Sequence, residues 1–202
     1  NSFPNNWTNS SLKKFIFKKI YQLSNHCIVN SLQTRNDFLN HYNIKSTCIY
    51  NPLNKNEIKI LSKKKVPNIY SKNLLKIINI GRLSEEKDHL TFIKALSLLK
   101  NKIKFEAVIV GKGILKNKIN YLVNNYGLKQ QVKLIGYKKN PYPYIRQCDF
   151  LILTSKHEGL PNILLEAIIL KNVNQWLQLT KGNSRLLYVE EPNETMDTYA
   201  LC

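Results

Sequence analysis

The sequence predicts an α/β fold in which helices cover both faces of a doubly wound parallel sheet. From residue 74 onward, short apolar runs alternate with segments of helical periodicity. The runs are apolar throughout instead of alternating with polar residues, which is typical of parallel strands buried on both faces. The predicted strands are Leu74–Ile80, Phe105–Val110, Val132–Ile135 and Phe150–Leu153.

Glycines mark the loops that follow these predicted strands. They are Gly81, Gly111, Gly113, Gly136 and Gly159. Any one of them is explained by ordinary turn chemistry, but glycine also lets the backbone approach a ligand closely. Because ligands bind at the carboxyl ends of strands in a doubly wound sheet, glycines at successive strand ends favour a binding site there.

Length and composition indicate a globular chain with a substantial core. It has 202 residues, of which 43% are hydrophobic. No apolar run approaches the ~18 residues of a transmembrane helix, and the first residues do not resemble a signal peptide. The four cysteines are scattered without Cys-x-x-Cys spacing, which indicates free thiols in a reducing compartment. We therefore expect a cytoplasmic location.

The net charge of +18 predicts attraction to polyanions such as nucleic acid, anionic lipid or phosphorylated substrates. The lysines are spread along the whole chain, and no zinc-finger or basic-zipper pattern accompanies them. A basic, non-enzymatic module that binds nucleic acid or a membrane surface is the alternative function that this charge suggests.

We interpret residues 1–52 as the end of a domain that precedes the sheet. A helix capped by Ser10 or Ser11 is expected to run to about Leu23, with an apolar stripe and a lysine-bearing side. Such a helix lies on a membrane surface in some proteins and is an ordinary surface helix in others. The elements expected after it are a strand at Cys27–Val29, a helix over 31–42 and a strand at Thr47–Tyr50.

Residues 53–73 are predicted to be a linker. The segment follows Asn51-Pro52, contains Pro67 and the run Lys63-Lys64-Lys65, and has no clear periodicity.

Residues 74–170 are predicted to form the ligand-binding domain. Asp88 is a suitable cap for a helix from His89 to Lys100. Further helices are expected at Ile114–Tyr126, at Tyr142–Arg146 and after Pro161.

The loop after the first predicted strand carries two cations, Arg82 and Lys87. The planar guanidinium of arginine suits two phosphate oxygens, and a lysine beside it adds a compact charge. Together with the positive end of the next helix, they suit a diphosphate that gains charge as it leaves. The alternative is a surface salt bridge to Glu85 or Glu86.

Two carboxylates, Glu158 and Glu166, flank the turn after the last predicted strand. They are candidates for an acid/base pair, although nothing in the spacing makes them face each other. A carboxylate on a helix beside a nucleotide site can instead accept hydrogen bonds from ribose hydroxyls. The four histidines, His26, His41, His89 and His157, have no partner at useful spacing.

Four motifs in this order resemble the donor-binding domain of family 4 glycosyltransferases, which are retaining enzymes of the GT-B fold. The resemblance covers about residues 25–169 and implies a Rossmann-like sheet. The motifs are Asn79-Ile80-Gly81-Arg82-Leu83-Ser84-x-Glu86-Lys87, Val110-Gly-x-Gly113, Ile135-Gly136 and Ser155-x-x-Glu158-Gly-Leu-Pro-Asn-x-x-Leu-Glu166-Ala167.

The resemblance implies a role for each matching residue. Arg82 and Lys87 would hold the nucleotide-sugar diphosphate, Glu158 would lie near the donor sugar, and these three would act in catalysis. Glu166 would bind the ribose, and Gly136-Tyr137 would lie near the base. The implied donor-binding residues are Gly81, Arg82, Lys87, Gly111, Gly113, Gly136, Tyr137, Glu158, Gly159, Leu160, Pro161, Asn162 and Glu166.

The implied reaction transfers a sugar to a glycan or lipid-linked acceptor in polysaccharide biosynthesis. It retains anomeric configuration by front-face attack and requires neither a metal nor a cofactor. The basic surface would then help at the inner face of an anionic membrane, and no specific nucleic-acid partner is expected.

The resemblance ends shortly after Leu170. Residues 171–202 form an atypical tail, which we interpret as a truncated, frameshifted or recombined reading frame. We expect the domain to be incomplete at both ends and to lack the final strands of its sheet. An inactive remnant is therefore a further alternative.

Overall fold

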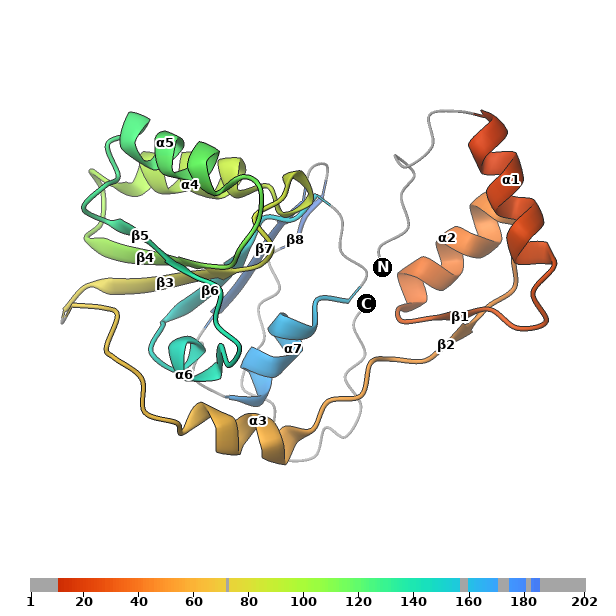
Figure 1. Ribbon diagram of the computed structural model, residues 1–202, viewed down its shortest axis with the longest axis horizontal. Coiled ribbons are helices and arrows are strands. Elements are labelled where there is room, and N and C mark those ends of the chain that lie inside the picture. The colour runs from red at the N-terminus through yellow and green to blue at the C-terminus, as the bar shows by residue number, and fades with distance from the viewer. Residues whose placement is uncertain (1–10, 72, 157–159, 171–174, 181–182, 186–202) are drawn as a thin grey trace.

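The computed structural model describes residues 11–71, 73–156, 160–170, 175–180 and 183–185. They form a small N-terminal lobe and a larger sheet domain (Figure 1). The lobe, residues 11–50, contains α1 (Ser11–Gln22), β1 (Ile28–Val29), α2 (Leu32–Tyr42) and β2 (Thr47–Cys48). The strands β1 and β2 form a two-stranded parallel sheet.

The sheet domain begins with α3 and then alternates strands with helices. Its elements are α3 (Lys55–Ser62), β3 (Leu75–Ile80), η1 (Glu85–Lys87), α4 (His89–Leu99), β4 (Phe105–Val110), α5 (Lys116–Asn125), β5 (Val132–Gly136), α6 (Tyr142–Ile145), β6 (Phe150–Leu153), α7 (Asn162–Ile169), β7 (Gln175–Thr180) and β8 (Asn183–Arg185). The predicted doubly wound α/β fold is confirmed, with strand order β5-β4-β3-β6-β7-β8.

The order in which the strands are added to the sheet reverses between β3 and β6. All neighbouring strands are parallel except the terminal pair β7 and β8. The chain builds outward from β3 through β4 to β5, then returns to place β6 on the other side of β3. The carboxyl ends of β3 and β6 therefore form the topological switch point, where open α/β sheets bind ligands.

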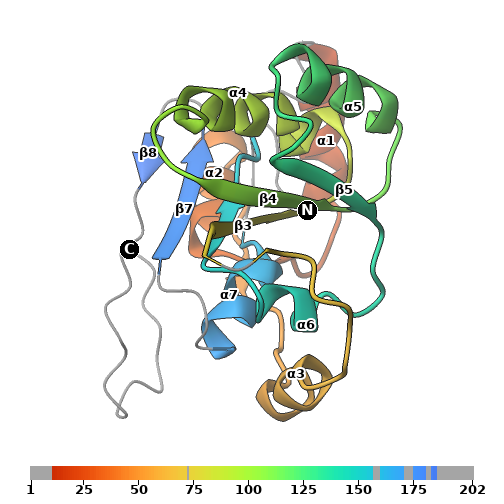
Figure 2. The same ribbon diagram turned by 90° about the vertical axis from the view of Figure 1, so that its left-hand side faces the viewer.

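Helices cover both faces of the sheet, as Figure 2 shows. On one face, α4 and α5 pack on a core that includes Ile77 and Ile109. On the other face, α3, α6 and α7 pack on a core that includes Ile78, Val108 and Leu151. Neighbouring strand residues such as Ile77 and Ile78 thus enter different cores, which explains why the strands are apolar without alternation.

The prediction of an irregular linker over residues 53–73 is wrong, because this segment contains α3. Asn54 caps α3 by accepting a hydrogen bond from the backbone N–H of Glu57 at 3.1 Å. Ile58 is buried in the same core as α6 and α7, and Asn140 donates to the Leu61 carbonyl at 2.9 Å. One turn of apolar residues among lysines gave too weak a periodicity to indicate this helix.

The prediction that the final strands of the sheet are missing is also wrong. β7 pairs in parallel with β6, with Phe150 opposite Gln175 and Leu153 opposite Gln178. The sheet therefore continues past the point where family-like sequence stops.

The lobe has a small core made by Val29, Phe38, Tyr42 and Ile44. Tyr21 of α1 meets Phe38 edge to face, with ring centroids 5.4 Å apart. α1 also exposes the apolar side chains of Phe15, Ile16 and Ile20, and Leu23 just after the helix is exposed as well. Among the described residues, no helix has the length and apolar character needed to span a bilayer.

Candidate functional site

The loop after β3 is fastened to the loop after β4 by backbone hydrogen bonds. The N–H of Leu83 donates to the Lys112 carbonyl at 3.0 Å, and the N–H of Leu115 donates to the Leu83 carbonyl at 3.1 Å. The Leu83 side chain is buried beneath them. The two loops therefore form one rigid rim at the carboxyl edge of the sheet.

The glycines of the β4 loop make this rim possible. A Cβ at Gly111 would overlap the Gly81 carbonyl oxygen, and a Cβ at Gly113 would overlap the Leu83 carbonyl oxygen. Loop packing alone therefore explains why both positions are glycine, without any contact to a ligand. Their contact with a sugar donor stays a prediction.

Arg82 and Lys87 lie at the two ends of the β3 loop. The Arg82 side chain is exposed and Lys87 is half-buried. No carboxylate of the described residues lies at ion-pair distance from Arg82; instead, Glu85 lies 3.3 Å from the Nζ of Lys118 and 3.9 Å from the Nζ of Lys156. The surface salt bridge considered for Arg82 is therefore absent from the described part of the chain.

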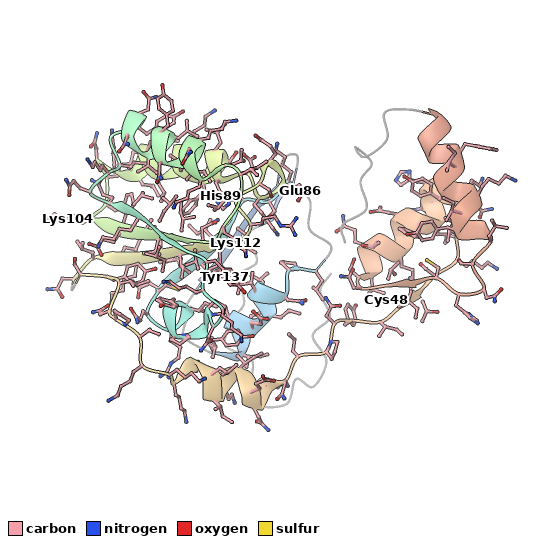
Figure 3. All side chains as sticks on the ribbon, in the orientation of Figure 1. Cys48, Glu86, His89, Lys104, Lys112 and Tyr137 are labelled. Carbon is pink, nitrogen blue, oxygen red and sulfur yellow. The ribbon has the colours of Figure 1, made fainter. Side chains whose placement is uncertain are left out.

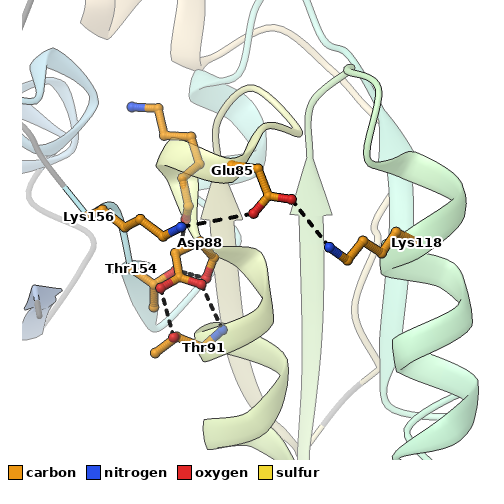
Figure 4. Close-up of polar contacts among 7 residues, drawn as sticks. Glu85, Asp88, Thr91, Lys118, Thr154 and Lys156 are labelled. Atoms are coloured by element: carbon orange, nitrogen blue, oxygen red, sulfur yellow. Dashed lines mark hydrogen bonds and ion pairs between the residues drawn. The ribbon is translucent and has the colours of Figure 1, made fainter. Parts of the chain in front are cut away.

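The loop after β6 is attached to the far end of the β3 loop (Figure 4). The Thr154 hydroxyl lies 3.1 Å from the Lys87 carbonyl and 3.0 Å from the Asp88 carbonyl, and the Lys156 N–H donates to the Glu86 carbonyl at 2.8 Å. Asp88 has a positive φ of 44° and caps α4 by accepting from Thr91. The loops that follow β3 and β6 at the switch point are thus joined directly.

His89 holds the near end of the same loop. Its Nε2 atom lies 3.0 Å from the Arg82 carbonyl oxygen, so Nε2 carries the proton and donates. Burial lowers the pKa of His89, and the charge of Lys87 lowers it further, against the opposing effects of the Arg82 carbonyl and Asp88. Sequence analysis found no partner for this histidine, because its partner is a backbone atom.

The end of β5 contributes Gly136 and Tyr137. Gly136 has a φ of 73°, a conformation that favours glycine. The Tyr137 side chain is 59% exposed, and the Nζ of Lys112 lies 5.0 Å from its ring centroid. Figure 3 shows Lys112 and Tyr137 close together beside the sheet. This cation–π pair leaves an aromatic surface open at the edge where a base is predicted to bind.

The helix α7 carries Glu166, whose carboxylate lies near the Tyr142 hydroxyl of α6. Burial raises the pKa of Glu166, while the nearby Tyr142 hydroxyl partly offsets that effect. Burial and the nearby Glu166 carboxylate raise the pKa of Tyr142 to about 12. At neutral pH Tyr142 is therefore protonated, and Glu166 is a half-buried carboxylate beside a neutral phenol.

The start of α7 also contacts the connection to the lobe. Asn162 accepts a hydrogen bond from the Asn51 side chain at 2.9 Å, and Leu160 and Pro161 before it are half-buried. Glu158 and Gly159, together with His157, lie outside the described residues. The predicted roles of Glu158 and Gly159 therefore remain predictions.

The structure brings most of the predicted residues to one edge. These residues lie at or just after the carboxyl ends of β3, β4 and β5: Gly81, Arg82, Lys87, Gly111, Gly113, Gly136 and Tyr137. Within the described part of the chain, no three His, Cys, Asp or Glu side chains gather in a way that suits a metal ion. Independence from metals nevertheless stays a prediction.

These features define a Rossmann-like α/β protein with a candidate anion site at the switch point of its sheet. The chain belongs to the family described as Glycosyl transferases group 1, whose sequence model matches residues 61–171. That match includes α6, α7 and β3 to β6 with their loops, and it supports the glycosyltransferase prediction over a non-enzymatic basic module.

A relative from Campylobacter jejuni illustrates the family. It is named N-acetylgalactosamine-N,N'-diacetylbacillosaminyl-diphospho-undecaprenol 4-alpha-N-acetylgalactosaminyltransferase, and it is 30% identical over 163 residues. The match covers 79% of this chain and 43% of the relative, so the chain spans less than half of that protein's length.

Solved glycosyltransferase structures of the GT-B type share the fold. TarM of Staphylococcus aureus, in complex with Fondaparinux, alpha-GlcNAc-glycerol and UDP, gives a TM-score of 0.66 at 22% identity, over 85% of this chain and 33% of TarM. HepE of Anabaena, in complex with UDP and glucose, gives a TM-score of 0.66 at 19% identity, over 79% of this chain and 46% of HepE. At these identities the likeness concerns the fold.

Proposed function

We propose that this chain provides the donor-binding part of a retaining, family 4 glycosyltransferase. The enzyme transfers a sugar from a nucleoside-diphosphate sugar to a glycan or lipid-linked acceptor. One observation carries the proposal: the Arg82–Lys87 loop is fixed at the switch point by the loops of β4 and β6. A loop held on both sides keeps its cations in place before any ligand arrives, which is how anion sites gain strength.

Each site residue takes a role that its chemistry supports. Arg82 forms paired hydrogen bonds to phosphate oxygens, and Lys87 adds charge as the nucleoside diphosphate leaves. Glu166 accepts a hydrogen bond from the ribose, and Tyr137 lies against the base. Glu158 acts near the donor sugar, and the segment from Gly159 to Asn162 supplies backbone N–H groups.

The acceptor and location follow from the relatives by analogy. The Campylobacter relative is named for an undecaprenol-linked substrate, so a lipid-linked acceptor at the inner face of a membrane fits this chain as well. The exposed Ile16 and Ile20 of α1, with Lys18 and Lys19 in the same helix, suit an anionic lipid surface. Cosedimentation with anionic and neutral vesicles tests this location, and equal binding to both would contradict it.

Calorimetric titration with UDP tests the donor site. UDP is the first probe because the TarM and HepE complexes contain it; GDP and dTDP follow. Arg82→Ala removes the guanidinium that faces the phosphates and is expected to weaken binding at least about tenfold, a loss of ~1.4 kcal/mol or more.

Arg35→Ala is the matched control, because it removes the same charge from an exposed position in the lobe. It is expected to leave nucleotide affinity unchanged. Equal affinity of Arg82→Ala and the unmodified chain would refute the assignment of the site.

A further inference from the structure

We propose that His89 and Thr154 are positioning residues that clamp the two ends of the Arg82–Lys87 loop and thereby set the spacing of its two cations. The inference rests on the proposed function, because it concerns how the same donor site is held in shape. Neither side chain is part of the predicted ligand contacts, and each hydrogen-bonds to backbone carbonyls of the loop.

His89 secures the beginning of the loop. Its side chain is 2% exposed, and Nε2 donates to the Arg82 carbonyl at 3.0 Å. The same carbonyl also accepts from the Ser84 N–H at 2.9 Å. The other ring nitrogen, Nδ1, is buried without a hydrogen-bond partner among the described residues. A buried nitrogen without a partner is costly, so packing alone does not account for histidine at this position.

Thr154 secures the end of the loop. It is the first residue after β6, its side chain is 2% exposed, and its hydroxyl reaches the carbonyls of both Lys87 and Asp88. Its single proton serves one of these carbonyls at a time. The backbone on either side of the Lys87 carbonyl is thus held against β6, the strand that leads into the second half of the site.

The two clamps differ from the rest of the rim in what they hold. The backbone bonds between the β3 and β4 loops fix Leu83, whereas His89 and Thr154 fix the residues that carry charge. A diphosphate requires its cations at a set separation, and small displacements weaken charge-assisted hydrogen bonds strongly. Loss of either clamp is therefore expected to weaken nucleotide binding without removing a cation.

Paired substitutions separate hydrogen bonding from size. His89→Gln keeps an N–H donor at a similar distance from the backbone, whereas His89→Met has a similar length without the donor. Thr154→Ser keeps the hydroxyl, whereas Thr154→Val keeps the shape without it. Each variant of the 202-residue chain is titrated with UDP by calorimetry, and its thermal unfolding is followed by circular dichroism.

Tyr70→Phe is the matched control for lost stability. Tyr70 is 4% exposed, and its hydroxyl donates to the Ile77 carbonyl at 2.8 Å, so this variant also loses one buried bond to a backbone carbonyl. Ile77 lies within β3, whereas the candidate site lies beyond its end. Tyr70→Phe is expected to lower the unfolding temperature and leave UDP affinity unchanged.

The expected result is that His89→Met and Thr154→Val each weaken UDP binding about five- to tenfold in folded protein. His89→Gln and Thr154→Ser are expected to stay within about twofold of the unmodified chain, since they retain the donor. Wild-type affinity in both His89→Met and Thr154→Val, alongside weakened binding in Arg82→Ala, would overturn the clamp and leave the donor site intact. If the unmodified chain binds none of UDP, GDP and dTDP, the proposed function itself fails.

Discussion

The lobe and the sheet domain bury their apolar side chains to very different degrees. The lobe has a core of 4 buried residues, whereas the domain has two cores of 13 and 12. Of the 15 large hydrophobic side chains that are exposed among the described residues, 9 lie within residues 11–50. The domain therefore supplies its own stability and carries the candidate site, while the lobe presents apolar surface suited to further contacts.

The largest expected effect comes from creating a cavity in the core of each region. Leu151→Ala, in the fully buried centre of the sheet domain, is expected to destabilise that domain by about 3 kcal/mol or more. Phe38→Ala is expected to disrupt the lobe core and leave the unfolding of the domain unchanged. Thermal and urea unfolding, followed by circular dichroism, give both transitions.

UDP affinity in the same two variants supplies the control. Phe38→Ala should bind UDP as the unmodified chain does, since every residue of the proposed site lies outside the lobe. A single transition that both substitutions shift equally would show that the two regions unfold together, contrary to this prediction.

A smaller loss of stability is expected when alanine replaces one of two glycines at the carboxyl edge of the sheet. Gly111→Ala forces the β3 and β4 loops apart, because its Cβ would overlap the Gly81 carbonyl, and a cost of about 2–3 kcal/mol is expected. Gly136→Ala meets no neighbour within 4 Å and incurs only the strain of a positive φ, about 1 kcal/mol. Urea unfolding should rank the two variants in this order, and the reverse order would contradict the packing role of Gly111.

The last prediction concerns pH and compares the buried histidine of the domain with the histidines of the lobe. The folded pKa of His89 lies below its ordinary value near 6.5, so the unfolded chain takes up this proton first. Stability should therefore fall as pH drops from about 6.5 toward the folded pKa, by up to ~1.4 kcal/mol per pH unit. The domain's unfolding free energy, measured between pH 7 and 5, should fall less in His89→Gln.

The lobe histidines supply the control for this pH effect. His26 and His41 belong to the lobe and to none of the site loops, so replacing either with glutamine should leave the pH profile of the domain unchanged. An identical profile for His89→Gln and the unmodified chain would count against a buried neutral histidine.

The elements predicted correctly are those whose signal is local. Phe105–Val110 and Phe150–Leu153 match the bounds of β4 and β6, because continuous apolar runs indicate buried parallel strands. The helix α3 was missed because only Ile58 and Ser62 are buried among its lysine-rich turns. β7 was missed because its pairing depends on the open edge of β6, which lies more than 20 residues earlier.

The same distinction applies to the candidate site. Arg82 and Lys87 were identified because cations between a strand and a helix form a sequence motif that matches known chemistry. His89 and Thr154 were missed because their partners are backbone carbonyls, and a bond to a carbonyl places no demand on the identity of the partner residue. The sequence around Thr154 suggested a strand end, but only the fold shows which carbonyl lies opposite.

The hydrogen bond between the Asn51 and Asn162 side chains has a mechanical consequence. It connects the segment that leaves the lobe to the first turn of α7. A rotation of the lobe about Asn51-Pro52 therefore requires either that this hydrogen bond breaks or that α7 moves as well. Because both amides are neutral, the strength of this hydrogen bond does not depend on ionic strength, although the chain has a net charge of +18. A net contribution of about 1 kcal/mol to stability is small enough for this hydrogen bond to break and re-form by thermal motion.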